Sequence, residues 1–161
     1  PVRIEICETI PDTGGAGFYR GGNGCKLGYR FLEPGEVSIH DDRWLTYPYG
    51  VNGGLPGGRS WKKLIRKDGT TEMLQSKADH VIVEEGDLLL FCTWGGGGWG
   101  DPLDRSPEDV LRDVRDEKVS IDYARREYGV AFDPTGHSVD ETVTTRLRSE
   151  MRLRARRAKG A

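Results

Sequence analysis

Phe91-Cys92-Thr93-Trp94-Gly95-Gly96-Gly97-Gly98-Trp99-Gly100-Asp101-Pro102 joins an apolar run to four consecutive glycines that lie between two tryptophans. Glycine has no Cβ and loses much backbone entropy on folding, so four in succession need a geometric reason. A flexible linker would seldom carry a tryptophan at each end. The stretch therefore favours a packed loop whose backbone closely approaches a ligand or another chain. It is not a P-loop, because no Lys-Ser/Thr follows the glycines.

Composition changes sharply at the end of this stretch. All but three of the 23 glycines precede Asp101, so the first two thirds predict turns and short strands and the remainder predicts helix. A chain of 161 residues fits one domain, or one with an appendage. Its net charge of −2 gives no case for nucleic acid, and no apolar run approaches a membrane span. The three cysteines and three histidines are scattered, so we expect reduced thiols, a cytoplasmic protein and no metal site.

Alternation of apolar residues predicts an antiparallel sandwich or barrel-like sheet in the first two thirds. Val2, Ile4 and Ile6 alternate with polar residues and predict a strand with one buried face, so the chain begins inside a sheet, as the continuation of something. A Pro-Gly turn joins the predicted strands 27–32 and 37–40, which predicts a hairpin. The other predicted strands are 60–66 and 71–74, paired through an Asp-Gly turn, with 81–83 and 88–93.

Helical signals follow Pro102, so the fold class is α+β overall and mainly β. Ser106 precedes Pro107 as an N-cap does, and Ser120 and Gly129 flank a second helix. Residues 138–141 form a capping box before a long helix with a thin apolar stripe and a basic end, which suits an acidic partner surface or a solvated tail. We divide the chain into a glycine-rich β domain (1–105), a helical hairpin packed on it (106–132) and a basic C-terminal helix or tail (133–161).

Motifs that recur in order between Pro1 and Phe132 resemble a known family. They include Asp12-Thr13-Gly14-Gly15-Ala16-Gly17, Arg20-Gly21-Gly22, Pro48-Tyr49-Gly50, Gly86-Asp87, the stretch from Gly95 to Pro102, Val110-Leu111-Arg112-Asp113-Val114 and Tyr128-Gly129-Val130. With these motifs the chain resembles the C-terminal part of B-type chains of the hydantoinase B/oxoprolinase family. This family includes ATP-dependent hydantoinases, 5-oxoprolinases and ketone carboxylases of the acetone and acetophenone type.

The resemblance implies chemistry shared between subunits. An A-type chain uses ATP to phosphorylate a carbonyl or amide oxygen, and the B-type chain acts on the activated intermediate. The large N-terminal region of B-type chains, where the family's metal-binding residues lie, is missing here. The resemblance therefore implies no metal ligand and no catalysis by this chain alone, and it places ATP and a divalent metal on partner subunits.

We therefore expect a small subunit that completes a split B-type chain, with larger A-type and B-type partners, in an ATP-dependent ketone carboxylase. The alternatives are a subunit or fragment of a hydantoinase or 5-oxoprolinase type amidohydrolase, and a purely structural scaffold. We expect neither a nucleic-acid nor a membrane partner.

No catalytic residue is assigned from the sequence. His40, Asp42 and Asp101 could act as bases, but a structural role is favoured for each of them. Glycine-aromatic loops usually connect strands, and connections often carry sites. The residues that we expect at a substrate pocket or subunit interface are Trp94, Gly95, Gly96, Gly97, Gly98, Trp99, Asp101, Arg20 and Tyr49.

Overall fold

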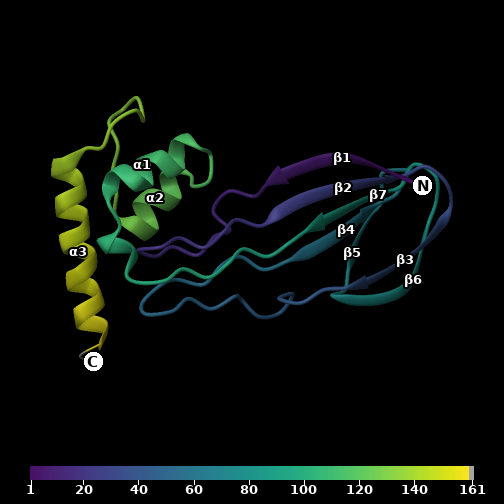
Figure 1. Cartoon of the computed structure of the whole chain (residues 1–161), viewed down its shortest axis with the longest axis horizontal. Coiled ribbons are helices and arrows are strands. Elements are labelled where there is room, and N and C mark those ends of the chain that lie inside the picture. The colour runs from purple at the N-terminus through teal and green to yellow at the C-terminus, as the bar shows by residue number, and fades with distance from the viewer. Residues whose placement is uncertain (160–161) are drawn as a thin grey trace.

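The computed structural model describes residues 1–159 and has β-sheets at one end and helices at the other (Figure 1). A five-stranded antiparallel sheet has the order β1 (Val2–Thr9), β2 (Cys25–Phe31), β7 (Leu88–Cys92), β4 (Trp61–Ile65) and β5 (Thr71–Leu74). A second sheet pairs β3 (Gly35–His40) with β6 (Lys77–Val83). The predicted fold class, mainly antiparallel β with C-terminal helices, is confirmed. Gly160 and Ala161, at the end of the predicted tail, lie outside the described residues.

The two sheets pack face to face around an apolar core. Ile39 and Val83 of the small sheet are buried against Leu64, Leu74 and Leu89 of the large sheet. Burial of such side chains is the main favourable term in folding, and each contributes about 1.5–3 kcal/mol. This core holds the sheet end of the molecule together.

The chain crosses from one sheet to the other at the Pro-Gly turn, so the predicted hairpin of strands 27–32 and 37–40 is wrong. β2 pairs with β1 and β7, whereas β3 pairs with β6. Phe31 and Ile39 end up on facing sheets in one core, because burying both apolar faces outweighs local pairing. The predicted hairpin of β4 and β5 is confirmed, and its turn places Gly69 at φ +89.

A β-bulge divides the apolar residues of β1 between two faces. Ile4 lies opposite Tyr29 and Ile6 lies opposite the next residue, Gly28, so one extra residue interrupts the register between them. Because facing residues share a side of the sheet, Ile6 points away from the side that carries Val2 and Ile4. The prediction of one buried face is therefore wrong: Val2 is 52% and Ile4 59% exposed.

Asp87 fastens the turn before β7 to the β4–β5 hairpin. Its buried carboxylate accepts hydrogen bonds from the backbone amides of Glu84 (3.0 Å) and Lys67 (3.0 Å) and from the Arg66 guanidinium (2.9 Å). Burial alone would raise the pKa of Asp87, but these donors favour the charged form and hold the pKa below its ordinary value. The Gly86-Asp87 motif thus has a structural role.

Replacing Asp87 with asparagine is expected to lower the free energy of unfolding at pH 7 by about 2 kcal/mol, because hydrogen bonds to a charged acceptor are lost. A carboxylate whose pKa is lowered by folding stabilises the protein above its unfolded pKa, near 4, and that stability is lost as the pH falls through the folded value. Urea unfolding at pH 7 and pH 3 should show a weaker acid dependence for Asp87→Asn than for wild type. Asp79→Asn, at an exposed position, should retain the wild-type dependence; equal behaviour of the two variants would contradict the prediction.

The helices follow the glycine-rich part of the chain. They are the short 3-10 helix η1 (Pro102–Asp104), α1 (Pro107–Arg115), α2 (Ile121–Tyr128) and α3 (Glu141–Lys159). The predicted caps are confirmed: Ser106 and Ser120 cap α1 and α2, and Gly129 ends α2 in the left-handed conformation at φ +61. α1 and α2 share a second core with glycine-rich loop residues, which contains Ala16, Val110, Val119, Tyr123, Ala124, Tyr128 and Val130.

α3 begins later than the capping box predicted. Asp140 is the N-cap of α3, because its carboxylate accepts a hydrogen bond from the backbone amide of Val143 (2.9 Å). Ser138 lies in the preceding loop instead, where its carbonyl accepts a hydrogen bond from the backbone amide of Asp133. The helix packs on this chain through buried Thr144, whose hydroxyl accepts the amide of Ala131 (3.0 Å). Among the described residues, no helix combines the length and apolar character needed to cross a membrane.

Candidate functional site

The sheets and helices are connected by a bundle of extended, glycine-rich segments with almost no regular secondary structure (Figure 1). Backbone amides and carbonyls of different segments are hydrogen-bonded to one another: Gly15 N donates to Gly96 O (2.8 Å), and Gly98 N donates to Leu55 O (2.9 Å). We call these segments the glycine bundle; they are residues 13–16, 21–24, 49–51, 55–58 and 95–98.

Gly95 to Gly98 form the axis of this bundle. A Cβ at Gly95 would lie 1.8 Å from the carbonyl oxygen of Thr13, and a Cβ at Gly97 would lie 1.9 Å from that of Tyr49. A Cβ at Gly98 would lie 2.1 Å from the carbonyl oxygen of Ala16. Backbone therefore approaches the axis from different sides, and only glycine fits. The prediction of a packed loop, rather than a flexible linker, is confirmed.

The two tryptophans lie at opposite ends of the glycine run. An extended run of this length spans about 15 Å, since each residue advances about 3 Å. Trp94 lies beside Gly24, where the bundle meets the sheets, and is 41% exposed. Trp99 lies at the helix end, next to Tyr19 with ring centroids 5.6 Å apart. The structure therefore places the two in different neighbourhoods, so they do not form one site.

A group of exposed side chains surrounds Trp99. The backbone of Trp99 pairs with Tyr19 and Val51, and Phe18 packs edge-on against Tyr19 at 4.8 Å between centroids. All four are between 40% and 63% exposed. We call Phe18, Tyr19, Val51 and Trp99 the aromatic patch. Exposed apolar groups held on rigid backbone are typical of protein or ligand contacts, and the sequence identified only Trp99 of this set.

Arg20 points into a buried ionic cluster. Its Nε lies 3.6 Å from the Asp113 carboxylate. The same carboxylate accepts a hydrogen bond from the Arg105 guanidinium (2.8 Å). The hydroxyl of Tyr128 is buried without a hydrogen-bond partner among the described residues, and burial raises the pKa of this phenol. The cluster therefore joins the bundle to η1 and α1. Asp113 belongs to one of the motifs that carry the family resemblance, but it was not among the expected site residues.

Other motif residues also hold the bundle to the helices. The carboxylate of Asp12, a residue at φ +64, accepts a hydrogen bond from the backbone amide of Ser120 at the start of α2 (2.7 Å). The side-chain amide of Asn23 donates a hydrogen bond to the carbonyl of Lys118 (2.8 Å). Asp101 caps η1 by accepting the amide of Leu103 (2.8 Å). Tyr49 contributes its backbone to the bundle, and its side chain is 73% exposed. The glycine-rich motifs thus have visible structural roles.

The polar residues at the end of β3 point in different directions. His40 is exposed, with Nε2 3.5 Å from Asp79, and Asp42 is also exposed. Asp41 is buried in contact with the ammonium of Lys62 and the hydroxyl of Ser60. Within the described part of the chain, no group of three or more His, Cys, Asp or Glu is placed to hold a metal ion.

The sequence matches the model of the family described as hydantoinase B/oxoprolinase over residues 1–102, which include both sheets and the glycine bundle. This chain belongs to that family. It is 43% identical over 130 residues to an uncharacterized protein of Methanocaldococcus jannaschii, covering 81% of this chain and 23% of that protein. It is 35% identical over 156 residues to the caprolactamase subunit beta of Pseudomonas jessenii, covering 89% of this chain and 25% of that subunit. The chain thus spans about a quarter of the length of these relatives.

Two solved structures share the fold. The ATP-dependent caprolactamase from Pseudomonas jessenii superposes with a TM-score of 0.79 at 33% identity, over 92% of this chain and 26% of that one. Nucleotide-free acetone carboxylase superposes with a TM-score of 0.81 over 99% of this chain and 26% of that one. At 23% identity, the likeness to acetone carboxylase concerns the fold alone.

Proposed function

We propose that this chain is one part of a hydantoinase-B-type unit in an ATP-dependent enzyme that hydrolyses a cyclic amide, and that it acts with larger A-type and B-type subunits. The observation that carries the proposal is the similarity to caprolactamase subunit beta, at 35% identity over 89% of this chain. A lactam oxygen is a poor leaving group until it is phosphorylated, which accounts for the use of ATP. We place ATP and the divalent metal on the partner subunits.

The contribution of this chain is to present a rigid surface. The glycine bundle fixes the aromatic patch through backbone packing, and pre-organised side chains bind a partner or substrate at a lower entropic cost. We infer that the aromatic patch, with Asp101 beside it, lies against a partner subunit where the substrate binds. The buried acids of this chain already have structural partners, which supports a role without its own catalytic base.

The proposal is tested on the complex purified from its source without a tag on this chain. Native mass spectrometry is expected to find larger A-type and B-type chains. ATP hydrolysis is then measured with a lactam, a hydantoin, 5-oxoproline, and acetone with bicarbonate. We expect a cyclic amide to give the largest stimulation, at least 10-fold over the rate without substrate. Stimulation only by acetone with bicarbonate would favour ketone carboxylation, the reaction expected from the sequence.

Substitution of Trp99 distinguishes a substrate-contacting role from a purely structural one. If Trp99 contacts the substrate region, Trp99→Ala in the assembled complex should change KM or substrate preference by about 10-fold, as the loss of a well-packed aromatic contact does at an interface. Trp94→Ala is the matched control at the other end of the bundle. Complexes that assemble less well but turn over identically would assign a purely structural role to the chain.

A further inference from the structure

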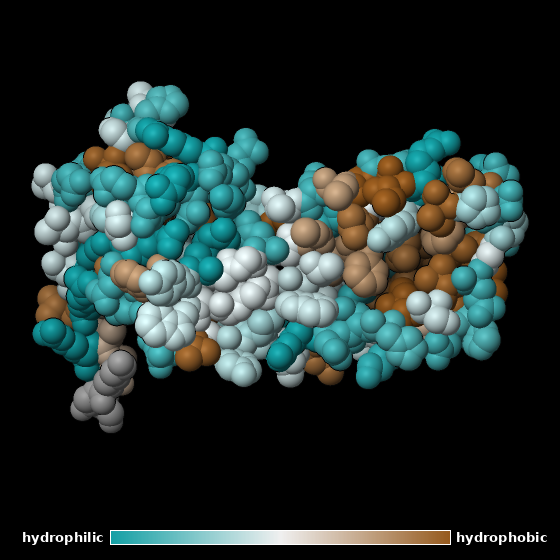
Figure 2. All heavy atoms as spheres, viewed as in Figure 1, coloured by the Kyte–Doolittle hydropathy of each residue, from teal (hydrophilic) through white to brown (hydrophobic). Residues whose placement is uncertain are grey.

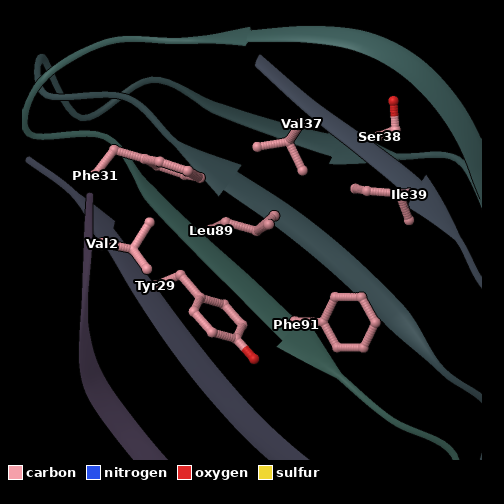
Figure 3. Close-up of a pocket in the computed structure, with 8 residues that line it drawn as sticks. All are labelled: Val2, Tyr29, Phe31, Val37, Ser38, Ile39, Leu89 and Phe91. Carbon is pink, nitrogen blue, oxygen red and sulfur yellow. The ribbon is translucent and has the colours of Figure 1, made fainter. Parts of the chain in front are cut away.

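An open apolar groove of about 290 Å³ lies between the two sheets. Figure 3 shows apolar side chains converging on it from strands of both sheets. It is lined by Val2, Tyr29, Phe31, Val37, Ser38, Ile39, Leu89 and Phe91. Among the described residues that line it, none is charged, and the only side-chain polar atoms are the hydroxyls of Tyr29 and Ser38. Small-molecule sites usually contain several polar groups that orient the ligand, so this groove is suited to an apolar protein segment.

The groove exists because the small sheet covers only part of the large one. Its lining comes from β1, β2, β7 and β3, and none comes from β6. The groove therefore lies on the side of β3 that is opposite to β6. Val2 lines the groove, and Ile4 lies on the same face of β1; both residues are more than half exposed. Figure 2 shows apolar residues gathered over the sheet end, around a hollow.

The backbone beside the groove is also available for pairing. Within the described residues, β3 pairs with β6 alone and β1 pairs with β2 alone, so each strand has one free edge. A free edge next to an apolar face is the usual receptor for an added strand, in which backbone hydrogen bonds provide affinity and alternate side chains fill the face.

We propose that an apolar strand from the rest of the hydantoinase-B-type unit fills this groove and pairs with the free edge of β3. This inference rests on the proposed function, because it takes its occupant from the three quarters of the relatives' length that this chain does not span. The added strand widens the small sheet until it covers Val2, Ile4 and Tyr29. The sandwich core is then completed by two separate chains that together form one family fold.

The test compares two isoleucines with similar exposure. Ile4 (59% exposed) lies on the groove side of β1, and Ile82 (55% exposed) lies on β6 opposite Glu36. In the complete unit, Ile4→Lys should weaken association with the larger B-type part at least 10-fold, and Ile82→Lys should leave it unchanged. Both variants of the free chain should melt within a few degrees of wild type. In wild type, hydrogen exchange of residues 35–40 should slow at least 10-fold on assembly.

The possible failures are distinguishable. If native mass spectrometry finds no larger hydantoinase-B-type part, the proposed function fails and this inference fails with it. A second outcome is that this part is present while Ile4→Lys assembles like wild type and the backbone amides of β3 exchange hydrogen as fast as in the free chain. In that case only the groove proposal is overturned. A dimer of this chain that Ile4→Lys dissociates would assign the groove to a second copy, and would also overturn it.

Discussion

Gly97→Ala is expected to abolish stable folding of the glycine bundle. The new Cβ would lie 1.9 Å from the carbonyl oxygen of Tyr49 and 2.6 Å from its carbon, and backbone atoms cannot turn aside as a side chain can. Overpacking usually costs about 1–3 kcal/mol, and we expect at least about 4 kcal/mol here because the axis of the bundle must move. For a chain of this size that corresponds to a loss of about 10 °C or more in Tm, measured by circular dichroism.

Two other glycines of the bundle provide matched controls. Gly22 has no atom within 4 Å of its Cβ position, so Gly22→Ala should melt within about 2 °C of wild type. Gly96 is intermediate, because its nearest neighbour, the amide nitrogen of Gly22, is 3.2 Å away. The expected order of stability is therefore Gly22→Ala, then Gly96→Ala, then Gly97→Ala. Equal melting of the first and last variants would show that the run does not occupy the axis.

Local signals in the sequence predicted the elements of the fold well. The Asp-Gly turn predicted the β4–β5 hairpin, Ser106 predicted the start of α1, and Ser120 and Gly129 predicted the two ends of α2. Each of these features depends on residues within a few positions of one another, where backbone geometry and capping decide the outcome. The mainly β fold class followed from the same signals.

Features that depend on distant contacts could not be predicted. Whether β3 pairs with β2 or with β6 depends on which faces bury each other, and a single strand pattern contains no such information. The bulge that turns Ile6 away from Ile4 has no clear local signature. The run at 95–98 predicted a packed loop, but its neighbours at 13–16 are about 80 residues away in the chain.

For the candidate site, too, the sequence predicted some residues and missed those that only distant contacts bring together. Aromatic and glycine content led to Trp99, but Tyr19 and Val51 join the aromatic patch through backbone pairing, and Phe18 through ring packing on Tyr19, which only the fold reveals. Arg20 was grouped with the pocket residues because it lies in a glycine-aromatic loop. Its guanidinium instead faces Asp113, an acid from a helix almost a hundred residues later.

Removing the Asp113 carboxylate is expected to be the second most damaging change. Its side chain is 9% exposed and faces two guanidinium groups that are themselves 14% and 15% exposed, Arg20 and Arg105. Asp113→Ala leaves both positive charges buried without a counter-ion, and breaking a buried ion pair in this way costs about 3–5 kcal/mol. We expect urea unfolding to show that loss at pH 7, together with release of the helices from the bundle.

Asp109 provides the control on the same helix. Its ion pair with Arg112 is exposed, so Asp109→Ala should cost no more than about 1 kcal/mol. Asp113→Leu separates lost charge from lost volume: it fills the space but leaves the guanidinium groups unpaired, and it should therefore be at least as unstable as Asp113→Ala. If Asp113→Leu were instead as stable as wild type, the cluster would be acting through packing, and its ion pairs would contribute little to stability.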